Sequence, residues 1–214
     1  MVKERIVLMG TGSEATWHPL SAVEGEFRSL FADLGNVEVA LNPSRLVSVD
    51  EDGTRLLVCY ADTWEAALTD DQTAGLLRFS AGGGKLLVIH NGMSYQKRQE
   101  FQALAGAKFT GHPPMTVMPF RCTAPEHPVC RNLAPVWELE EEPYRFEFHS
   151  AVDVQVLYDY QHEGAWYPAA WTTHFGRGDA VYLMPGHNAA SFRHPPYREL
   201  VRSAAQWLLG KEAD

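Results

Sequence analysis

The sequence predicts an α/β protein with an open, mainly parallel sheet that carries helices on both faces, and with a second half rich in antiparallel strands. Two observations lead to this prediction. Short apolar strand patterns alternate with helical patterns up to about residue 104, and alternating strand patterns with proline-rich connections follow before a final helical pattern. The 214 residues contain no repeat and no linker-like segment, so we expect a single domain over residues 1–214.

The first strand and helix are expected before residue 35. Arg5–Met9 is a short apolar run that ends in a glycine-containing loop, as a buried parallel strand does. Apolar residues then recur at helical spacing, at Val23, Phe27, Leu30, Phe31 and Leu34. This stripe predicts a helix that begins at Pro19 or Ser21 and ends at Gly35 in the C′ position. Asn36–Leu41 predicts the second strand.

The next two strands flank a helix with a clear start. Arg55–Tyr60 and Lys85–His90 are apolar runs typical of buried strands. Between them, Thr69 is a polar cap that precedes two acidic residues, so a helix should run from there to about Ser80. The three glycines at 82–84 precede a strand rather than a helix, which favours a helix end over a phosphate-binding loop.

The second half is less regular, and its elements are predicted from alternation and turn residues. We expect a helix over Gln96–Leu104, strands over Met115–Cys122 and Val152–Tyr158, a hairpin of Ala169–Thr173 with Asp179–Met184, and a helix from about Pro195. One face of the last helix carries Leu200, Val201, Ala204, Trp207 and Leu208. This apolar face should pack on the sheet and close the fold.

Composition excludes several classes of function. Eighteen Lys and Arg against 27 Asp and Glu give a net charge of −9, which would repel a nucleic acid backbone. No apolar run approaches the roughly 20 residues of a membrane-spanning helix, and no signal peptide is recognisable, so we expect a cytoplasmic protein without membrane contact. The cysteines Cys59, Cys122 and Cys130 form no metal-binding pair, and a bridge between Cys122 and Cys130 stays open.

Polar and aromatic residues gather where the predicted strands end. In open parallel sheets the ligand crevice lies outside the carboxyl ends of the strands. The residues that follow these strand ends are Trp17, His18, Asp62, Trp64, His90, Asn91, His187 and Asn188. Because the fold itself does not require them, we interpret them as candidates for binding and catalysis.

Histidine supplies the strongest functional signal. Four of the nine histidines lie at strand ends or in loops rich in glycine and proline: His18, His90, His112 and His187. Imidazole can ligate a metal, carry protons near neutral pH or bind a sugar hydroxyl. No closely spaced ligand pair is present, so a divalent zinc or manganese ion would have to be held from separate loops, by His18, His90 and His187. We interpret His127, His162 and His194 as surface residues and leave His149 and His174 open.

The acidic run near residue 140 has two interpretations. Glu138 and Glu140 are expected to lie on a solvated face. Glu141 and Glu142 precede Pro143-Tyr144, and a carboxylate beside such a turn can reach a neighbouring crevice. One of them could orient a histidine or act as a general acid or base.

Several segments, taken together, carry the motifs of one known family over nearly the whole chain. Gly82–His90 resembles the helix–strand–elbow element of that family, Gly106–Pro113 its "GG-x-F-x-x-H" segment, and Glu141–Tyr144 its "D-E-x-Y" motif. Pro168–Tyr182 with the later Gly186-His187 resembles its "P-x-x-W … G-x-G-R-V-x-Y … GH" ending. In this order, the four segments resemble the ThuA-like (trehalose utilisation) family. The segment before His18 departs from that family's common "H-x-x-H" type, since only one histidine is present there.

The resemblance implies a flavodoxin-like sheet similar to that of class I glutamine amidotransferases, with an active-site elbow after a central strand. His90 stands at the elbow where an amidotransferase has its cysteine nucleophile, so no glutaminase activity is expected. The family is associated with catabolism of trehalose and related disaccharides through keto-sugars, in which a separate sugar dehydrogenase is a partner. The family analogy also implies a homo-oligomer.

The residues and the resemblance together predict a carbohydrate-active protein, and we lean towards an enzyme. His90 and His187 are the expected acid–base pair, with Glu142 orienting one of them. The expected substrate-binding residues are His18, Trp17, Asp62, Trp64, Asn91, His112, Tyr144 and Asn188. Two alternatives remain: a sugar-binding protein without catalysis, and a metal-dependent hydrolase that uses the same histidines.

Overall fold

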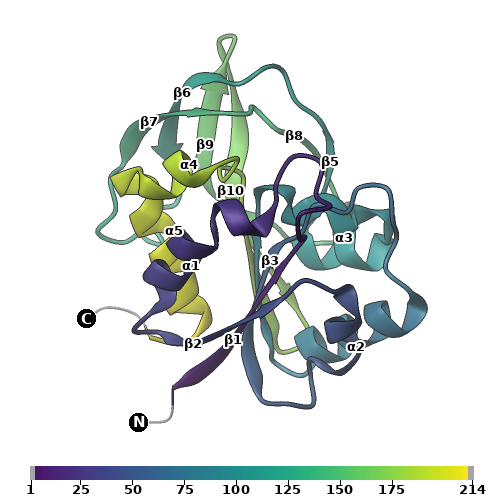
Figure 1. Ribbon diagram of the computed structural model, residues 1–214. Coiled ribbons are helices and arrows are strands. Elements are labelled where there is room, and N and C mark those ends of the chain that lie inside the picture. The colour runs from purple at the N-terminus through teal and green to yellow at the C-terminus, as the bar shows by residue number, and fades with distance from the viewer. Residues whose placement is uncertain (1–2, 212–214) are drawn as a thin grey trace.

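The computed structural model describes residues 3–211. A nine-stranded sheet has the order β2-β1-β3-β4-β11-β10-β9-β6-β7, and β5 and β8 form a separate two-stranded sheet (Figure 1). The strands are β1 Glu4–Gly10, β2 Gly35–Ala40, β3 Thr54–Tyr60, β4 Lys85–Ile89, β5 Ala107–Gly111, β6 Thr116–Cys122, β7 Val136–Glu141, β8 Arg145–Phe148, β9 Gln155–His162, β10 Ala165–Phe175 and β11 Gly178–Leu183. The α-helices are α1 Glu24–Phe31, α2 Asp70–Ala81, α3 Gln99–Ala105, α4 Ala189–Arg193 and α5 Pro195–Leu208.

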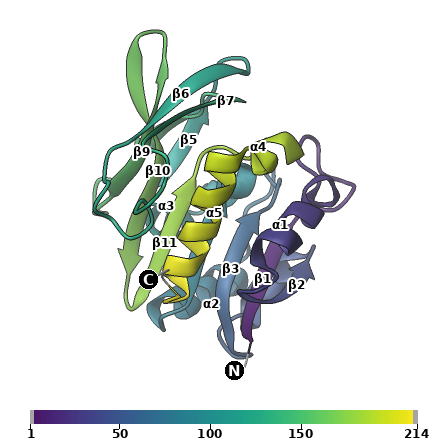
Figure 2. The same ribbon diagram turned by 90° about the vertical axis from the view of Figure 1, so that its left-hand side faces the viewer.

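Strands β2, β1, β3, β4 and β11 form the parallel half of the sheet. The apolar runs of β1, β3, β4 and β11 are buried on both sides, because α1 and α5 cover one face and α2 and α3 cover the other (Figure 2). The capping box at Thr69, whose hydroxyl accepts from the backbone N–H of Gln72, fixes the start of α2 as the sequence predicts. The predicted α/β class with a parallel first half is confirmed.

The antiparallel half begins where β10 pairs with β11. Strand β10 also pairs with β9, which pairs with β6, and β6 pairs with the edge strand β7. The predicted hairpin of β10 and β11 is therefore confirmed. Among residues 3–211, no helix combines the length and hydropathy that are required to cross a bilayer.

The first helix is shorter than its apolar stripe predicts. A turn of 3₁₀ helix covers Leu20–Ala22, and α1 occupies only Glu24–Phe31. The expected helix end at Gly35 was wrong, because this residue begins β2. A Cβ atom at Gly35 would lie 2.4 Å from the backbone oxygen of Glu4 on β1. Close packing of two strands, rather than a left-handed helix cap, explains the glycine.

Several elements of the second half differ from the prediction. Residues His90–Lys97 form a 3₁₀ helix, so α3 begins at Gln99 rather than Gln96. Strand β9 begins at Gln155 and not at residue 152. Strands β5, β7 and β8 were not predicted. The edge strand β7 contains the acidic run, in which Glu138 and Glu140 are exposed as expected while the residues between and beside them point inward.

Candidate functional site

The four side chains of the candidate site come from loops at one edge of the sheet. His18 follows β1, His90 follows β4 directly and His187 follows β11. Because these strands are parallel, their carboxyl ends meet at the same edge, as the topology predicts. Glu142 follows β7 and reaches this edge from the antiparallel half. We call His18, His90, His187 and Glu142 the His–Glu cluster.

His90 occupies a sharp turn between β4 and the following 3₁₀ helix. Its φ angle of 48° lies in the left-handed region that residues other than glycine rarely adopt. Gly92 allows this turn to pack on β3, because a Cβ atom there would lie 2.0 Å from the backbone oxygen of Cys59. The His90 side chain is fully buried, with Nδ1 2.8 Å from the backbone oxygen of Met184. The turn therefore fixes the ring in one orientation.

The ligand-type atoms of the cluster converge. Nε2 of His18 lies 3.1 Å from Nδ1 of His187, which lies 3.2 Å from Oε2 of Glu142. The same carboxylate oxygen lies 3.2 Å from Nε2 of His90. One ligand atom from each of the four residues can be chosen so that all lie within 4.8 Å of one another. Three imidazoles and one carboxylate thus point at a common position.

Groups behind the cluster orient the rings. The backbone oxygen of Met184 can only accept, so Nδ1 of His90 donates to it and Nε2 is the ring atom directed at Glu142. Nδ1 of His18 faces Oδ1 of Asp62 at 3.8 Å, which leaves Nε2 toward the cluster. The backbone N–H groups of Trp17 and His18 donate to Oδ2 of Asp62, at 2.9 and 3.0 Å. This arrangement resembles the carboxylate–histidine pairs that stand behind metal-bound histidines.

The pKa values of the cluster are shifted in opposite directions. Burial tends to raise the pKa of Glu142, but contacts with His187 and His90 outweigh burial and hold it well below its usual range. The same carboxylate raises the pKa of His187. Burial lowers the pKa of His18. Asp62 is also buried, which alone would raise its pKa, yet its hydrogen bonds with His18 and Trp17 lower it to about 2.

Glu141, next to the cluster, ties the end of β7 to the loop after β11. Its side chain is fully buried. Oε2 accepts hydrogen bonds from the backbone N–H of Gly186 at 2.7 Å and of His187 at 3.2 Å, and from the hydroxyl of Ser191 at 2.7 Å. This carboxyl group therefore positions the backbone that carries His187.

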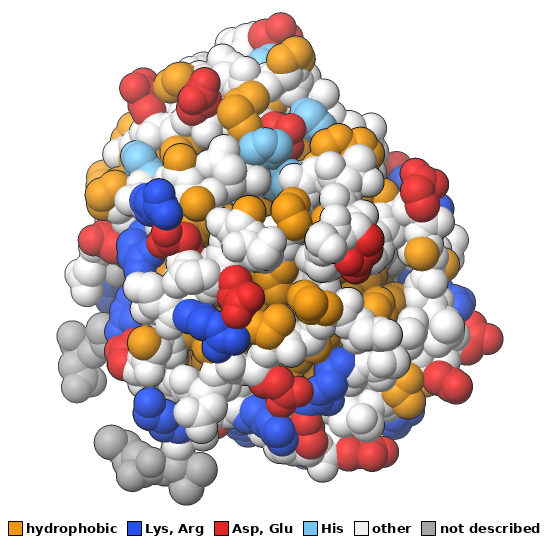
Figure 3. All heavy atoms as spheres, viewed as in Figure 1, with side chains coloured by type: hydrophobic (Ala, Val, Ile, Leu, Met, Phe, Trp, Pro, Cys, Tyr) orange, Lys and Arg blue, Asp and Glu red, His pale blue; other side chains and the backbone are white. Residues whose placement is uncertain are grey.

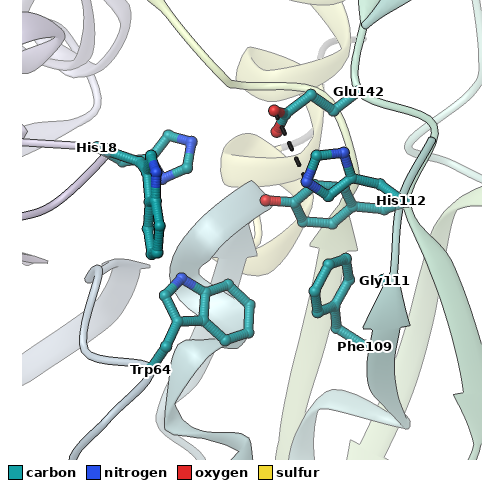
Figure 4. Close-up of a pocket in the computed structure, with 8 residues that line it drawn as sticks. His18, Trp64, Phe109, Gly111, His112 and Glu142 are labelled. Atoms are coloured by element: carbon teal, nitrogen blue, oxygen red, sulfur yellow. Dashed lines mark ion pairs between the residues drawn. The ribbon is translucent and has the colours of Figure 1, made fainter. Parts of the chain in front are cut away.

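A cavity of about 530 Å³ opens over the cluster. Its lining residues are Trp17, His18, Trp64, Phe109, Gly111, His112, Glu142 and Tyr144. The Tyr144 ring stacks between the rings of His90 and His112, with centroids 4.3 and 5.2 Å away, respectively. Figure 4 shows His18 and Trp64 opposite His112 and Phe109, with Glu142 facing His112 across an ion pair of 3.8 Å. In Figure 3, histidines gather beside acidic and hydrophobic side chains in the upper part of this face.

The donor set of the cluster could hold a metal ion. Around an ion bound at about 2.0–2.1 Å in a tetrahedron, neighbouring ligand atoms lie about 3.3–3.4 Å apart. Three separations within the cluster, 3.1, 3.2 and 3.2 Å, are close to that spacing, and all four ligand atoms lie within 4.8 Å of one another. Nε2 of His90 and Oε2 of Glu142 are buried, and the contacts they make within the described residues are with other members of the cluster. Nitrogen and carboxylate ligands of this kind suit zinc and manganese.

Comparison with known families identifies the chain. The sequence model of the trehalose utilisation family, ThuA, matches residues 8–208. This chain belongs to the ThuA family. The match includes all four residues of the His–Glu cluster, the end of β1 and the whole of β4, β7 and β11. A search of curated proteins found no significant match.

Solved structures show the same fold in other ThuA-like proteins. One from Parabacteroides merdae superposes with a TM-score of 0.80 at 15% identity, over 100% of this chain and 92% of that chain. One from Bacteroides uniformis gives 0.77 at 16% identity, over 99% and 93%. The GH42 β-galactosidase Gan42B from G. stearothermophilus gives 0.60 at 18% identity over 94% of this chain, but over only 30% of the enzyme. At these identities, the likeness concerns the fold.

The other residues that the sequence predicts for substrate binding in this ThuA family member lie either at the cavity or away from it. Trp17, Trp64, His112 and Tyr144 line the cavity, and Asp62 lies behind His18. Asn91 is fully buried below the site, and its amide donates to the backbone oxygen of Tyr60. Asn188 caps α4 from an exposed position, outside the cavity lining.

Sequence reasoning missed two contributors and misplaced three histidines. Phe109 and Gly111 line the cavity, and the signals that could have found them were the glycine-rich turn and the family-like segment Gly106–Pro113 that contains both. His127, His162 and His194 are half-buried rather than surface residues. His162 accepts a hydrogen bond from Arg145, and His194 packs beside Trp137, because the antiparallel strands and α5 enclose these positions.

The cysteines lie away from the elbow that His90 occupies. Cys59 is buried in β3, where burial raises the pKa of its thiol to about 12. Cys122 ends β6, and Cys130 lies buried in the segment before β7. All three are free thiols, so the pairing of Cys122 with Cys130 that the sequence left open is not formed. The strand-to-helix elbow that the family resemblance implies is present, with an imidazole at its tip.

Proposed function

We propose that this ThuA family member is a metal-dependent enzyme of carbohydrate catabolism that converts a trehalose-type disaccharide or a keto-glycoside. The observation that carries the proposal is the convergence of three histidines and Glu142 at the base of an aromatic-walled cavity. An enzyme site commonly combines such convergent polar groups with apolar walls that receive the substrate.

His18, His90, His187 and Glu142 would hold the ion. Nε2 of His90 and Oε2 of Glu142 support this assignment, because both are buried and their contacts are with other members of the cluster, with no hydrogen-bond partner outside it among the described residues. A divalent ion bound there would polarise a sugar oxygen or carbonyl as a Lewis acid. Asp62 and the backbone oxygen of Met184 would keep the ligand rings of His18 and His90 in the required tautomers.

The walls of the cavity would position the sugar. Trp64, Phe109 and Tyr144 present ring surfaces that can cover the C–H face of a pyranose. His112 is one-third exposed and lies 3.8 Å from Oε1 of Glu142. It is therefore placed to exchange a proton between a bound sugar and solvent, with Glu142 as its charge partner.

A metal-free form of the same function is favoured by one specific contact. Nδ1 of His187 lies 3.2 Å from Oε2 of Glu142, a histidine–carboxylate pair of the kind that acts in general acid–base catalysis. In this form His90 and His187 are the acid–base pair and Glu142 orients them. A keto-glycoside substrate would be supplied by a separate sugar dehydrogenase, and the enzyme would act as a cytoplasmic homo-oligomer.

Turnover by histidine variants tests the proposal. The purified chain, dialysed against Zn²⁺ or Mn²⁺, is incubated with α,α-trehalose and with its 3-keto derivative, and products are followed by NMR. We expect wild-type turnover of one of them and a loss of about 100-fold or more in His187→Ala and Glu142→Gln. His174→Ala is the matched control, because this histidine is exposed and pairs with Asp179 at the opposite edge of the sheet. Binding without any product would favour a sugar-binding protein, and equal turnover by His187→Ala would refute the site.

A further inference from the structure

A second cavity of about 300 Å³ adjoins the cavity over the His–Glu cluster. The two share Trp17 and Trp64 in their linings, so these side chains stand between them. The second cavity is bounded by the loop after β1, the segment after β2 and the segment after β3. The role proposed for the His–Glu cluster does not account for this second cavity.

We propose that the two cavities are adjacent subsites for the two rings of an uncharged disaccharide, whose glycosidic link crosses the Trp17–Trp64 divide. The inference rests on the proposed function and specifies its substrate class. Each volume lies near or within the range of about 300–1,000 Å³ that is typical of small-molecule sites. A single sugar ring bound over the His–Glu cluster would leave the second cavity to solvent.

Apolar exposure in the second cavity points to a ligand with a C–H face. Trp17 is 64% exposed and Leu41 is 51% exposed, although both are large apolar side chains. Both line the second cavity, where Pro43 adds further apolar surface. A pyranose ring seated there would cover these surfaces and remove them from water.

The polar groups of the second cavity are hydrogen-bond acceptors that suit sugar hydroxyls. Glu14 and Glu65 contribute carboxylates, and Thr16 contributes a hydroxyl. Asp62 also lines this cavity, and its buried Oδ1 lies 3.8 Å from Nδ1 of His18, beyond hydrogen-bond length, so this oxygen accepts no hydrogen bond from the described residues. A buried acceptor without a partner costs stability unless a donor reaches it, and a ligand hydroxyl is such a donor.

Charge in the two cavities disfavours a phosphorylated sugar. Neither cavity has a lysine or arginine among its described lining residues, whereas Glu14, Asp62, Glu65 and Glu142 all contribute carboxylates. Lys97 pairs with Glu65 at 3.7 Å, but it is outside both linings. In the second cavity, away from the ion proposed for the His–Glu cluster, a phosphate dianion would therefore meet Glu14, Asp62 and Glu65 without a cationic partner, which selects against a phosphate on the ring bound there.

Calorimetric titration of cavity-filling variants tests the two subsites. Ala66 is exposed and lines only the second cavity, so Ala66→Phe should fill that cavity. Ala32→Phe is the matched control, because Ala32 is exposed at the end of α1, away from both cavities. The metal-loaded wild type and both variants are titrated with glucose, α,α-trehalose and trehalose 6-phosphate.

We expect the wild type to bind trehalose about tenfold more tightly than glucose, and trehalose 6-phosphate more weakly than trehalose. Ala66→Phe should lose about tenfold or more in affinity for trehalose and keep its affinity for glucose within about twofold. Ala32→Phe should change neither. Unchanged trehalose affinity in Ala66→Phe, or an equal loss for both sugars, would overturn the two-subsite inference alone.

A second pair of variants tests the same inference independently, so that the test remains valid if Ala66→Phe does not fold. Leu41→Ala removes apolar surface from the second cavity, while Val47→Ala shortens an exposed aliphatic side chain elsewhere. We expect a selective threefold to tenfold loss in trehalose affinity for Leu41→Ala only. Preferred binding of trehalose 6-phosphate would overturn the assignment to an uncharged sugar. Failure of the wild type to bind either neutral sugar would contradict the proposed function itself.

Discussion

Replacing Glu141 with leucine removes the buried connection between the end of β7 and the loop that carries His187. The carboxyl group accepts four hydrogen bonds, three from the loop and the start of α4 and one from the backbone N–H of Glu142. Leucine has a similar size but no acceptor, so the substitution leaves these donors without partners. The donors of Gly186 and Ser191 are in buried residues and cannot turn to water.

The expected loss in the free energy of unfolding follows from these bonds. Each hydrogen bond to a charged group contributes about 1.5–3 kcal/mol, and neighbouring contributions do not add fully. We therefore expect Glu141→Leu to lower the free energy of unfolding by about 3–5 kcal/mol. Glu141→Gln keeps one acceptor oxygen and should cost about 1.5–3 kcal/mol.

Urea unfolding followed by circular dichroism at pH 7 measures these differences. Glu140→Leu is the matched control on the same strand, since Glu140 is exposed, and it should change the free energy of unfolding by less than about 0.5 kcal/mol. A loss below about 1 kcal/mol for Glu141→Leu, or a similar loss in both variants, would refute the reasoning that Glu141 fixes the loop.

Two further predictions concern the groups around the cluster. Asp62→Asn should weaken zinc binding by about 10–100-fold in a competition assay with a chelating dye, because Asp62 orients His18; equal affinity would show that it does not. In protein stripped of metal, Glu142→Gln should destabilise most between about pH 4.5 and 6.5, measured by urea unfolding. The pKa of His187 is raised by folding, so its contribution to stability is complete below pH 6.5 and is lost as the pH rises through that raised pKa. The pKa of Glu142 is lowered by folding, so its contribution is complete above pH 4.5 and is lost as the pH falls through that lowered pKa. A pH-independent difference would contradict this ion pair.

The parallel half of the fold could be predicted because its signals are local. Buried strands such as Arg55–Tyr60 are continuous apolar runs, and the cap at Thr69 marks a helix start without reference to the rest of the chain. Strand β7 was missed because its exposed glutamates dominate the composition of the segment. The alternation of Trp137, Leu139 and Glu141 toward the interior was the signal that could have revealed a strand.

For the site, the sequence predicts which residues lie near one another but not the contacts between their side chains. Topology places the strand ends of His18, His90 and His187 at one edge, so their gathering follows from the fold. The contribution of Glu142 depends on the register of β7 at the far edge of the sheet, which sequence does not determine. The orientation of His90 depends on a backbone oxygen of Met184, 94 residues away, and no residue pattern encodes such a contact.

Metal content measures the central claim, that the His–Glu cluster holds a divalent ion, most directly. Untagged protein purified without chelator is analysed by plasma mass spectrometry, together with His90→Ala, His187→Ala and the control His174→Ala. The account predicts about one zinc or manganese ion per chain in the wild type and in His174→Ala, and loss of the ion in the other two variants. A wild type that holds no ion after incubation with Zn²⁺ or Mn²⁺, or a stoichiometric ion in His90→Ala, would contradict it.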